Sequence, residues 1–263
     1  MKFANVDGNR TEATKAFTGH CPICDSELVA RCGEVNVNHW AHKGNRNCDS
    51  WSENETAWHR SWKNCFPIDW QEVVQFDERG EKHIADVMTQ AGFVLEIQHS
   101  FLNPEERRAR NAFYKKLVWV VDGTRRKTDI AQFQKAVEES TIIWKEPLIR
   151  RVHFPEEVRL LKEWHGSNAL VFFDFQGTDD KTQPKLWFLF PAISASQAYL
   201  SIFSRESFIE LHNDNKFDEI VSNVILPIRE ILAENIKRSR NQPQRLPKFA
   251  RNTTNLRRRR RRL

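Results

Sequence analysis

The chain has 263 residues, 40% of them hydrophobic and including 9 Trp and 18 Phe, so it can bury a sizeable core and is not wholly disordered. Its formal net charge is +6, but twelve Lys and Arg and no acid follow Glu234, which leaves residues 1–234 net acidic. Because the sequence shows neither a run of about 20 uncharged apolar residues nor a secretory leader, we expect a cytoplasmic protein that does not enter a membrane.

Residues 1–50 are predicted to form a zinc-ribbon-like module. Cysteines crowd this part of a chain without an export signal, which favours thiolate metal ligands over disulfides. A structural Zn²⁺ needs four nitrogen or sulfur ligands, and a Cys-x2-Cys turn supplies two of them. The candidates are Cys21, Cys24, His39, His42 and Cys48. This set holds one ligand too many, and we favour His42 over His39; Cys32 is a weaker candidate. The alternative is a turn of buried thiols and hydrogen-bonded histidines.

A helix follows, capped by Ser52 or Ser50 and ending before Pro67. Two stripes of helical period mark it. The apolar stripe consists of Trp51, Trp58, Trp62 and Cys65, and the polar stripe of Glu55, His59 and Lys63. His59 is as consistent with a hydrogen-bonded helix residue as with a catalytic group.

Three strands are predicted next, at 71–77, 82–88 and 92–99, the first two joined by a turn over 78–80. Asp86 lies on the second strand, and Glu96 and Gln98 share one face of the third. Two carboxylates on neighbouring antiparallel strands can meet around a hard cation, so we expect Asp86 and Glu96 to bind Mg²⁺ or Mn²⁺, with Glu55 completing the site. The alternative is a surface hairpin with solvated acids.

Asn103 is predicted to cap a helix over 104–116, followed by a buried parallel strand over 117–121 and a helix over 129–139. Residues 51–145 thus form an α/β unit of order αβββαβα. Arg110 and Tyr114 lie one turn apart on the first of these helices. Arg110 either binds a phosphate or braces Glu96, and we expect Tyr114 to brace.

Residues 146–234 are predicted to form a small α/β appendage, with strands at 169–175, 185–190 and 198–203 and a helix over 218–238 interrupted near Pro227. This module could bind a protein partner or a second copy of the chain. Residues 235–263 form a basic, disordered tail. Six consecutive arginines of this tail are expected to bind nucleic-acid phosphates: Arg257, Arg258, Arg259, Arg260, Arg261 and Arg262. The same composition would also suit a solvated tail without a partner or a tail that binds an acidic protein surface.

Together these motifs resemble the competence protein CoiA-like nucleases over about residues 18–125. The resemblance is carried by Cys21-x2-Cys24, His39-Trp-Ala-His42-Lys43, Glu55-x3-His59-x3-Lys63, Ala85-Asp86-Val87, Glu96-x-Gln98-x-Ser100 and Arg110-x3-Tyr114. It implies a PD-(D/E)XK restriction-endonuclease-like core, catalytic Mg²⁺, and DNA as substrate in the uptake, recombination or restriction of foreign DNA. The catalytic set would be Glu55, His59, Lys63, Asp86, Glu96 and Gln98.

One position departs from the superfamily pattern, because Gln98 stands where a Lys is usual. An amide can orient water or a phosphate oxygen but carries no positive charge, which Lys63 could supply instead. Three functions therefore stay open: a DNA-cleaving enzyme, a zinc-containing DNA-binding protein with a weak or inactive core, and an effector of an antiphage defence system. The residues alone do not distinguish DNA from RNA as substrate.

Overall fold

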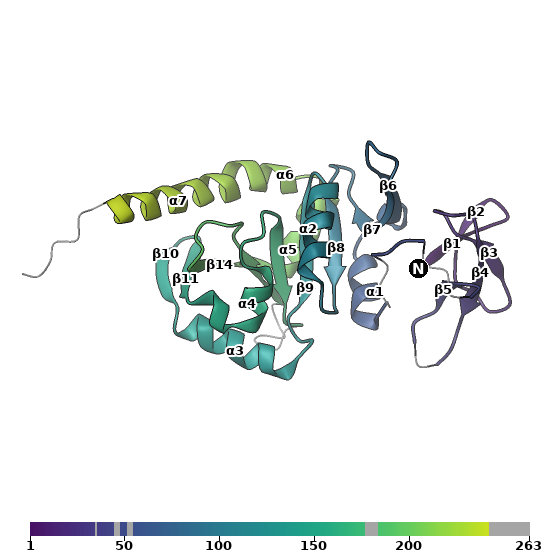
Figure 1. Ribbon diagram of the computed structural model, residues 1–263, viewed down its shortest axis with the longest axis horizontal. Helices are drawn as coiled ribbons and strands as arrows, with labels where there is room; N and C mark the ends of the chain where they lie inside the picture. The colour runs from purple at the N-terminus through teal and green to yellow at the C-terminus, as the bar shows by residue number, and fades with distance from the viewer. Residues whose placement is uncertain (35, 45–47, 52–54, 177–183, 242–263) are drawn as a thin grey trace, which may run out of the picture.

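The computed structural model describes residues 1–34, 36–44, 48–51, 55–176 and 184–241. Within these ranges the strands form two sheets (Figure 1). The N-terminal sheet is antiparallel, with the order β2-β1-β3-β4-β5. Its strands are β1 (Phe3–Val6), β2 (Asn9–Glu12), β3 (Thr18–His20), β4 (Glu27–Arg31) and β5 (His39–His42).

The N-terminal sheet has a small core. Its fully buried hydrophobic side chains include Leu28 and Trp40, and the Trp40 indole donates to the Thr11 carbonyl over 2.9 Å. Cys21 is buried in the same cluster. So few apolar side chains provide little stabilisation from burial, which is the situation in which small modules rely on a metal.

The second sheet has the order β10-β11-β14-β13-β12-β9-β8-β7-β6. Only β8–β9 and β9–β12 pair in parallel; the other neighbours are antiparallel. Its strands are β6 (Gln71–Phe76), β7 (Lys82–Met88), β8 (Val94–Gln98), β9 (Leu117–Asp122), β10 (Thr141–Lys145), β11 (Leu148–His153), β12 (Leu170–Asp174), β13 (Lys185–Leu189) and β14 (Gln197–Ser204).

The helices complete a mixed α/β architecture. The order αβββαβα predicted for residues 51–145 is observed as far as α3, and β10 then follows where no strand was predicted. The helices are α1 (Ala57–Lys63), α2 (Pro104–Phe113), α3 (Lys127–Glu138), α4 (Arg159–Trp164), α5 (Arg205–Asn213), α6 (Phe217–Ile220) and α7 (Leu226–Asn241). Short 3-10 turns lie at Ile68–Trp70 and Pro155–Glu157.

Residues 146–234 do not form the separate appendage that was predicted. Their strands continue the sheet begun by residues 71–122. Strand β12 pairs in parallel with β9, and β13, β14, β11 and β10 follow outward. The sequence analysis anticipated β12, β13 and β14 but neither β10 nor β11, which form a hairpin at the edge. Residues 146–234 therefore share one core with the strands that carry the candidate acids.

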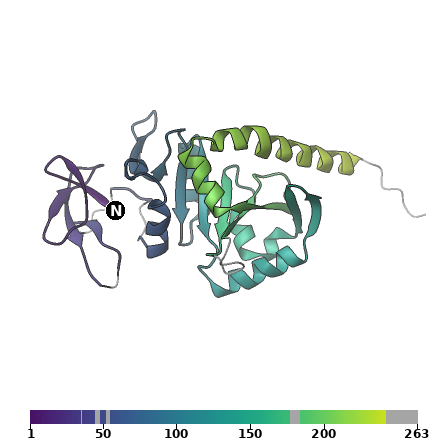
Figure 2. The same ribbon diagram turned by 180° about the vertical axis from the view of Figure 1, so that it is seen from behind.

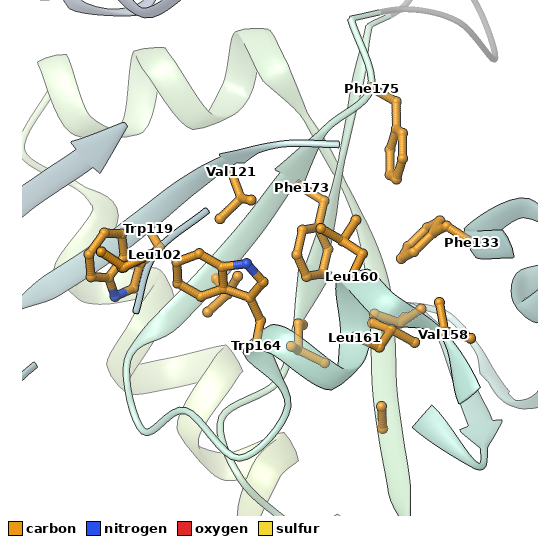
Figure 3. Close-up of a cluster of buried hydrophobic side chains, with 14 of the residues drawn as sticks. Leu102, Trp119, Val121, Phe133, Val158, Leu160, Leu161, Trp164, Phe173 and Phe175 are labelled. Atoms are coloured by element: carbon orange, nitrogen blue, oxygen red, sulfur yellow. The ribbon is translucent and has the colours of Figure 1, made fainter. Parts of the chain in front are cut away.

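Helices cover both faces of this sheet, as the two opposite views show (Figures 1 and 2). On one face, α3 and α4 contribute Phe133, Leu161 and Trp164 to a core with Trp119 and Phe173 (Figure 3). On the other face, α1, α5, α6 and α7 supply Trp62, Phe208, Phe217 and Leu232. The sheet is thus the central layer of three.

Helix α1 begins later than predicted. Thr56 is the N-cap, and its hydroxyl accepts the His59 amide over 3.2 Å. Trp51 lies before the helix and stacks on His83 at 3.2 Å between ring centroids, whereas Trp58 and Trp62 stay on the helix. The predicted cap Ser52 lies outside the described residues. The spacing of Trp51 fits the helical period by coincidence. The residue lies outside the helix and packs against His83 of β7.

The C-terminal helix is interrupted where the sequence predicted. A π-helical turn, Val221–Ile225, separates α6 from α7, and the Leu226 amide donates to the Val221 carbonyl. Pro227 follows at once and has no amide hydrogen to donate, so the regular hydrogen-bond pattern cannot continue through it. No helix in the described part of the chain is long and apolar enough to span a membrane.

Candidate functional site

The Cys-x2-Cys turn lies between β3 and β4 and is folded by its own backbone. The Asp25 amide donates to the Cys21 carbonyl and the Cys21 amide to the Ser26 carbonyl, both over 2.9 Å. The Ile23 amide points at the Cys21 sulfur over 3.4 Å. This compact turn presents the sulfurs of Cys21 and Cys24 to the end of β5.

Four side chains gather there: Cys21, Cys24, His42 and Cys48, whose ligand atoms all lie within 4.8 Å of one another. The Sγ atoms of Cys21 and Cys48 are 3.5 Å apart, and His42 Nε2 lies 3.4 Å from the sulfur of Cys24 and 3.5 Å from that of Cys48. Tetrahedral Zn²⁺ with Zn–S bonds of about 2.3 Å spaces its sulfurs by about 3.8 Å. The donor set and its spacing therefore suit a metal ion.

The electrostatics of Cys24 suit the same role. Burial opposes ionisation, but hydrogen bonds from Ser26 and interactions with His42 and Cys48 lower the pKa of Cys24 to about 6. A thiolate is the form that binds metal. The cluster is therefore arranged to hold at least one sulfur deprotonated at neutral pH.

His39 and Cys32 are not part of the cluster. His39 hydrogen-bonds through Nδ1 to the Val37 carbonyl over 2.9 Å, and the Cys32 sulfur contacts the Ala13 carbonyl. Side chains alternate along a strand, so His39 and His42, three residues apart on β5, must point to opposite faces. The preference for His42 agrees with this arrangement, and the ambiguity over His39 is removed.

The candidate acids lie where β7 and β8 stop pairing. The register runs Met88↔Val94 and Val87↔Leu95, and its continuation would set Asp86 against Glu96. Instead the Asp86 carboxylate accepts the Ile97 amide over 2.9 Å. The side chain of Asp86 thus replaces a backbone partner, and a cavity opens between the strands.

This cavity of about 60 Å³ collects residues that the sequence placed on separate elements. Its lining includes every residue of the predicted catalytic set together with Arg110: Glu55, His59, Lys63, Asp86, Glu96, Gln98 and Arg110. The space can hold an ion and a water or two, since one water occupies about 30 Å³ in the liquid. Helices α1 and α2 and strands β7 and β8 all contribute to this lining.

Glu96 is the least satisfied acid of the cavity. It is 3% exposed, and its Oε2 receives Arg110 Nη1 over 2.6 Å, while Oε1 has no hydrogen-bond partner in the described structure. Burial, reinforced by the nearby charge of Asp86, outweighs Arg110 and raises the pKa of Glu96 to about 8. A cation in the cavity would favour its ionised form.

Asp86 is held ionised by His59 of α1. The imidazole Nε2 lies 2.8 Å from Asp86 Oδ1. Burial opposes the charge on Asp86, but His59 and Lys63 lower its pKa below the ordinary value. His59 therefore acts on the cavity through Asp86, and its position favours a role in orienting that carboxylate.

Glu55 differs from the expectation that it completes a metal site. Its Oε1 receives Arg60 over 2.7 Å and Lys63 over 2.6 Å, and Arg60 also binds Oε2. Glu55 does not group with Asp86 and Glu96 as a set of three ligands within the described chain. Arg60 and Lys63 hold the Glu55 carboxylate by ion pairs, which explains why it lies apart from the other two acids.

Lys63 is likewise engaged. Its Nζ lies 2.6 Å from an oxygen of each of Glu55 and Glu72, and it is 2% exposed. Its pKa is raised, because these acids and Asp86 overcome the effect of burial. Lys63 thus neutralises acids and is not free to take the place of the lysine that Gln98 replaces. Gln98 itself donates to the Ser100 carbonyl over 3.1 Å.

Arg110 is a bracing residue in this structure. Besides Glu96 it holds Glu106 and donates to the Trp51 carbonyl over 2.7 Å. Tyr114 ends α2, is buried, and has no partner for its hydroxyl in the described structure. Burial and the charge of Glu96 raise the pKa of Tyr114, so this phenol stays protonated.

Two cavity residues, Asp49 and Glu72, were missed by the sequence analysis. Asp49 accepts His83 Nδ1 over 2.8 Å and the Ile84 amide over 3.0 Å. Its partner is 34 positions away, and no local spacing signals that contact. Glu72 lies across from Asp86 in the β6–β7 register, so a predicted hairpin register could have found it.

The predicted phosphate-binding arginines 257–262 lie outside the described residues. In a comparison with known families, residues 7–50 match the family model described as the N-terminal domain of competence protein CoiA. No curated protein and no solved structure matches the chain. The matched segment contains all four residues of the Cys–His cluster. Residues 7–50 are therefore similar to the N-terminal domain of competence protein CoiA.

Proposed function

We propose that the chain is a metal-dependent nuclease of the PD-(D/E)XK type that hydrolyses DNA, with a competence-related role in processing foreign DNA. The observation that carries the proposal is one cavity lined by residues of α1, β7, β8 and α2, which includes the whole catalytic set expected from the sequence motifs and the family resemblance. Within it, Asp86 on β7 and Glu96 on the neighbouring strand β8 come directly beside the last paired positions, Val87 and Leu95.

The residues fit a hard divalent cation in part. Asp86 offers an ionised carboxylate, and Glu96 offers an oxygen without a partner. Mg²⁺ is commonly bound through one or two carboxylates and keeps several waters, so two acids are enough. When bound, such an ion lowers the pKa of its water and stabilises charge on a transferring phosphoryl group.

The chain's own groups then have distinct tasks. His59 fixes the orientation of Asp86, and Arg110 fixes that of Glu96. Lys63 neutralises Glu55 and Glu72, which prevents those acids from repelling a phosphodiester. The Gln98 side chain can position a water or a phosphate oxygen by hydrogen bonding.

We also propose that the Cys–His cluster holds a structural Zn²⁺. Three sulfurs and one imidazole nitrogen fill a tetrahedral shell, which leaves no open position for substrate. The loop that carries Cys48 continues directly into Asp49, which binds β7 two residues before Asp86. A metal at the cluster would therefore steady one wall of the cavity.

The nuclease proposal is tested by cleavage of circular DNA, linear DNA, single-stranded DNA and RNA with added Mg²⁺ or Mn²⁺. Asp86→Asn and Glu96→Gln should each lower the rate about 100-fold or more, since a metal contributes several kcal/mol to the transition state. Glu138→Gln, an exposed acid on α3, is the matched control and should cut within about twofold of the wild type.

A second candidate is a DNA-binding protein with an inactive core. It is favoured by Gln98 and by the ion pairs that occupy both Glu55 and Lys63. Folded, metal-loaded wild type that binds DNA but leaves every substrate intact would establish this alternative. Equal cleavage by the wild type and both acid variants would instead exclude this cavity as the site of the reaction.

A further inference from the structure

A large groove in the described part of the chain lies away from the candidate acids. It has a volume of about 910 Å³ and lies between α2, the 165–170 loop, and the start of α7. Its lining includes Phe93, Leu117 and Leu170, which stand at the amino ends of β8, β9 and β12. The acids Asp86 and Glu96 lie further along the sheet, so this groove is separate from their cavity.

The groove is strongly basic. Five cationic side chains line it, against one acid, Asp218. The cations are Arg107, Arg108, Lys115, Lys116 and Arg229. Since residues 1–234 are net acidic, this concentration of positive charge is local. It marks the groove as a site for an anion.

Several of these cations have no carboxylate to neutralise them. Lys116 pairs with Asp218 over 3.0 Å, and Arg229 donates to the Ala192 carbonyl over 2.8 Å. Arg108 and Lys115, both exposed, form no ion pair with any described residue. Arg107 lies over the Trp164 ring at 5.4 Å, and burial and the charge of Arg108 lower its pKa. A bound anion would relieve this repulsion between neighbouring cations.

The distribution of the charges favours a ligand with several phosphates. Arg108 lies on α2, which ends at Phe113, Lys115 follows beyond that end, and Arg229 lies on α7. The cations thus come from different segments around the groove. The volume also exceeds what a single phosphate fills and lies in the range of sites for larger ligands. A ligand that carries phosphates at intervals would therefore contact more of these cations than one phosphate can.

Helix α2 connects the groove to the acid cavity. Arg110, on the same helix, holds Glu96, while Arg107 and Asn111, within one turn of it, line the groove. A chain lying along α2 would thus run from the groove towards the acids. The groove wall also includes Val221 and Leu226 at the ends of the π-helical turn, an irregularity often found at functional sites.

We infer that this groove binds the phosphate backbone of a nucleic-acid strand and guides it along α2. The inference deepens the proposed function, because it names where the nucleic acid is held outside the acid cavity. Contacts of this kind are independent of sequence. They weaken as the salt concentration rises, because release of counterions from the nucleic acid then gains less entropy.

The test compares two double variants with the same change in charge. Arg108→Glu/Lys115→Glu reverses two groove cations, and Lys127→Glu/Lys135→Glu reverses two exposed cations on α3. Affinity for a fluorescent 20-nucleotide single strand is measured by anisotropy over a range of salt, without added divalent metal. We expect the groove variant to bind about tenfold more weakly or worse and with a shallower salt dependence, and the α3 variant to bind within about twofold of the wild type.

Equal affinities of the two variants would overturn the inference. It would also be overturned if pyrophosphate or a mononucleotide displaced the strand from the wild type at low concentration, because the groove would then be a small-anion site. Arg108→Gln/Lys115→Gln gives a milder change if the reversed variant does not fold, and should show the same ranking.

The outcome is separable from that of the nuclease proposal. At saturating DNA the groove variant should cleave at the wild-type maximal rate but require more DNA to reach it. If the wild type cuts nothing yet the groove variant binds weakly, the nuclease proposal fails and the groove inference stands. If Asp86→Asn abolishes cleavage but the groove variant binds and cuts like the wild type, the nuclease proposal stands and the groove inference fails.

Discussion

His212 on α5 is buried in an aromatic cage. It is 1% exposed and stacks on Phe217 at 3.9 Å between centroids, with Phe208 and Phe93 at its edges. Neither ring nitrogen has a hydrogen-bond partner among the described residues. Burial disfavours the imidazolium and lowers the pKa of His212 to about 3. The histidine is therefore folded as a neutral aromatic ring.

This residue should make the fold acid-sensitive. In the unfolded chain the imidazole takes up a proton below its ordinary pKa of 6.5, while in the folded chain it does so only near pH 3. The unfolded state thus binds more protons in this window, and the free energy of unfolding should fall as pH drops from 6.5, by up to about 1.4 kcal/mol per pH unit. Above pH 6.5 the residue should have no effect.

We expect His212→Leu to remove that dependence. Urea denaturation measures the free energy of unfolding at each pH. Between pH 6.5 and 4.5 this free energy should fall by about 2–3 kcal/mol less in the variant than in the wild type. His153→Leu, at an exposed position of β11, should keep the wild-type slope. Parallel pH profiles for the wild type and His212→Leu would contradict the assignment.

Residues of the acid cavity could be selected from sequence where the signal was local. Glu96 and Gln98 share a strand face by a period of two, and His59 and Lys63 share a helix face. What these residues contact could not be predicted, because each partner comes from another element. Glu55 shows this: its spacing fits the polar stripe, yet Arg60 and Lys63 occupy both of its oxygens.

At the scale of elements, the strands with strong patterns were predicted well and the others were missed. Strand β7 has the predicted bounds, and β9 is buried throughout, as its apolar run indicated. Strands β1 and β2 were not predicted, because each has only 4 residues, too few to establish an alternating pattern. Strand β10 is an edge strand with mostly exposed side chains, but its β-branched and aromatic residues, TIIWK, are typical of a strand and could have predicted it.

The Cys–His cluster should hold the N-terminal sheet together. We expect freshly purified protein to contain one equivalent of zinc, and Cys21→Ser to lose it, since Cys21 is the buried ligand. Loss should speed amide exchange in β3, β4 and β5. Cys32→Ser is the matched control, because Cys32 belongs to the same core but not to the cluster, and it should keep the metal. Zinc retained by Cys21→Ser would refute the site.

At the scale of the whole molecule, one buried acid joins the two sheets. Both oxygens of Glu72 accept the Lys2 amide, over 2.7 and 2.8 Å, and Oε2 also accepts the Phe3 amide over 3.0 Å. Lys63 approaches the same carboxylate from α1. Glu72 lies opposite Asp86, with a backbone φ of +46°, a left-handed conformation that costs a non-glycine residue about 1–3 kcal/mol.

Neighbouring strands β6, β7 and β8 thus carry three acids, Glu72, Asp86 and Glu96, and each contacts a basic side chain from a helix. The partners are Lys63 for Glu72, His59 for Asp86 and Arg110 for Glu96. Buried charges are tolerated only when they are paired in this way. The sequence predicted that Asp86 and Glu96 lie on neighbouring strands, whereas Glu72 was missed, although the register of the predicted β6–β7 hairpin sets it beside Asp86.

Glu72 binds both β1 and α1, so its removal should lower the stability of the whole fold. We expect Glu72→Ala to lower the free energy of unfolding by about 3–5 kcal/mol. The variant leaves two backbone amides without an acceptor and removes a partner of buried Lys63. Glu12→Ala is the matched control, since Glu12 is half-exposed and pairs with the Lys2 side chain at 3.4 Å, and it should cost less than about 1 kcal/mol. Urea denaturation measures both, and amide exchange at Lys2 and Phe3 should accelerate only in Glu72→Ala. Equal losses in the two variants would show that the sheets are joined by something other than this carboxylate.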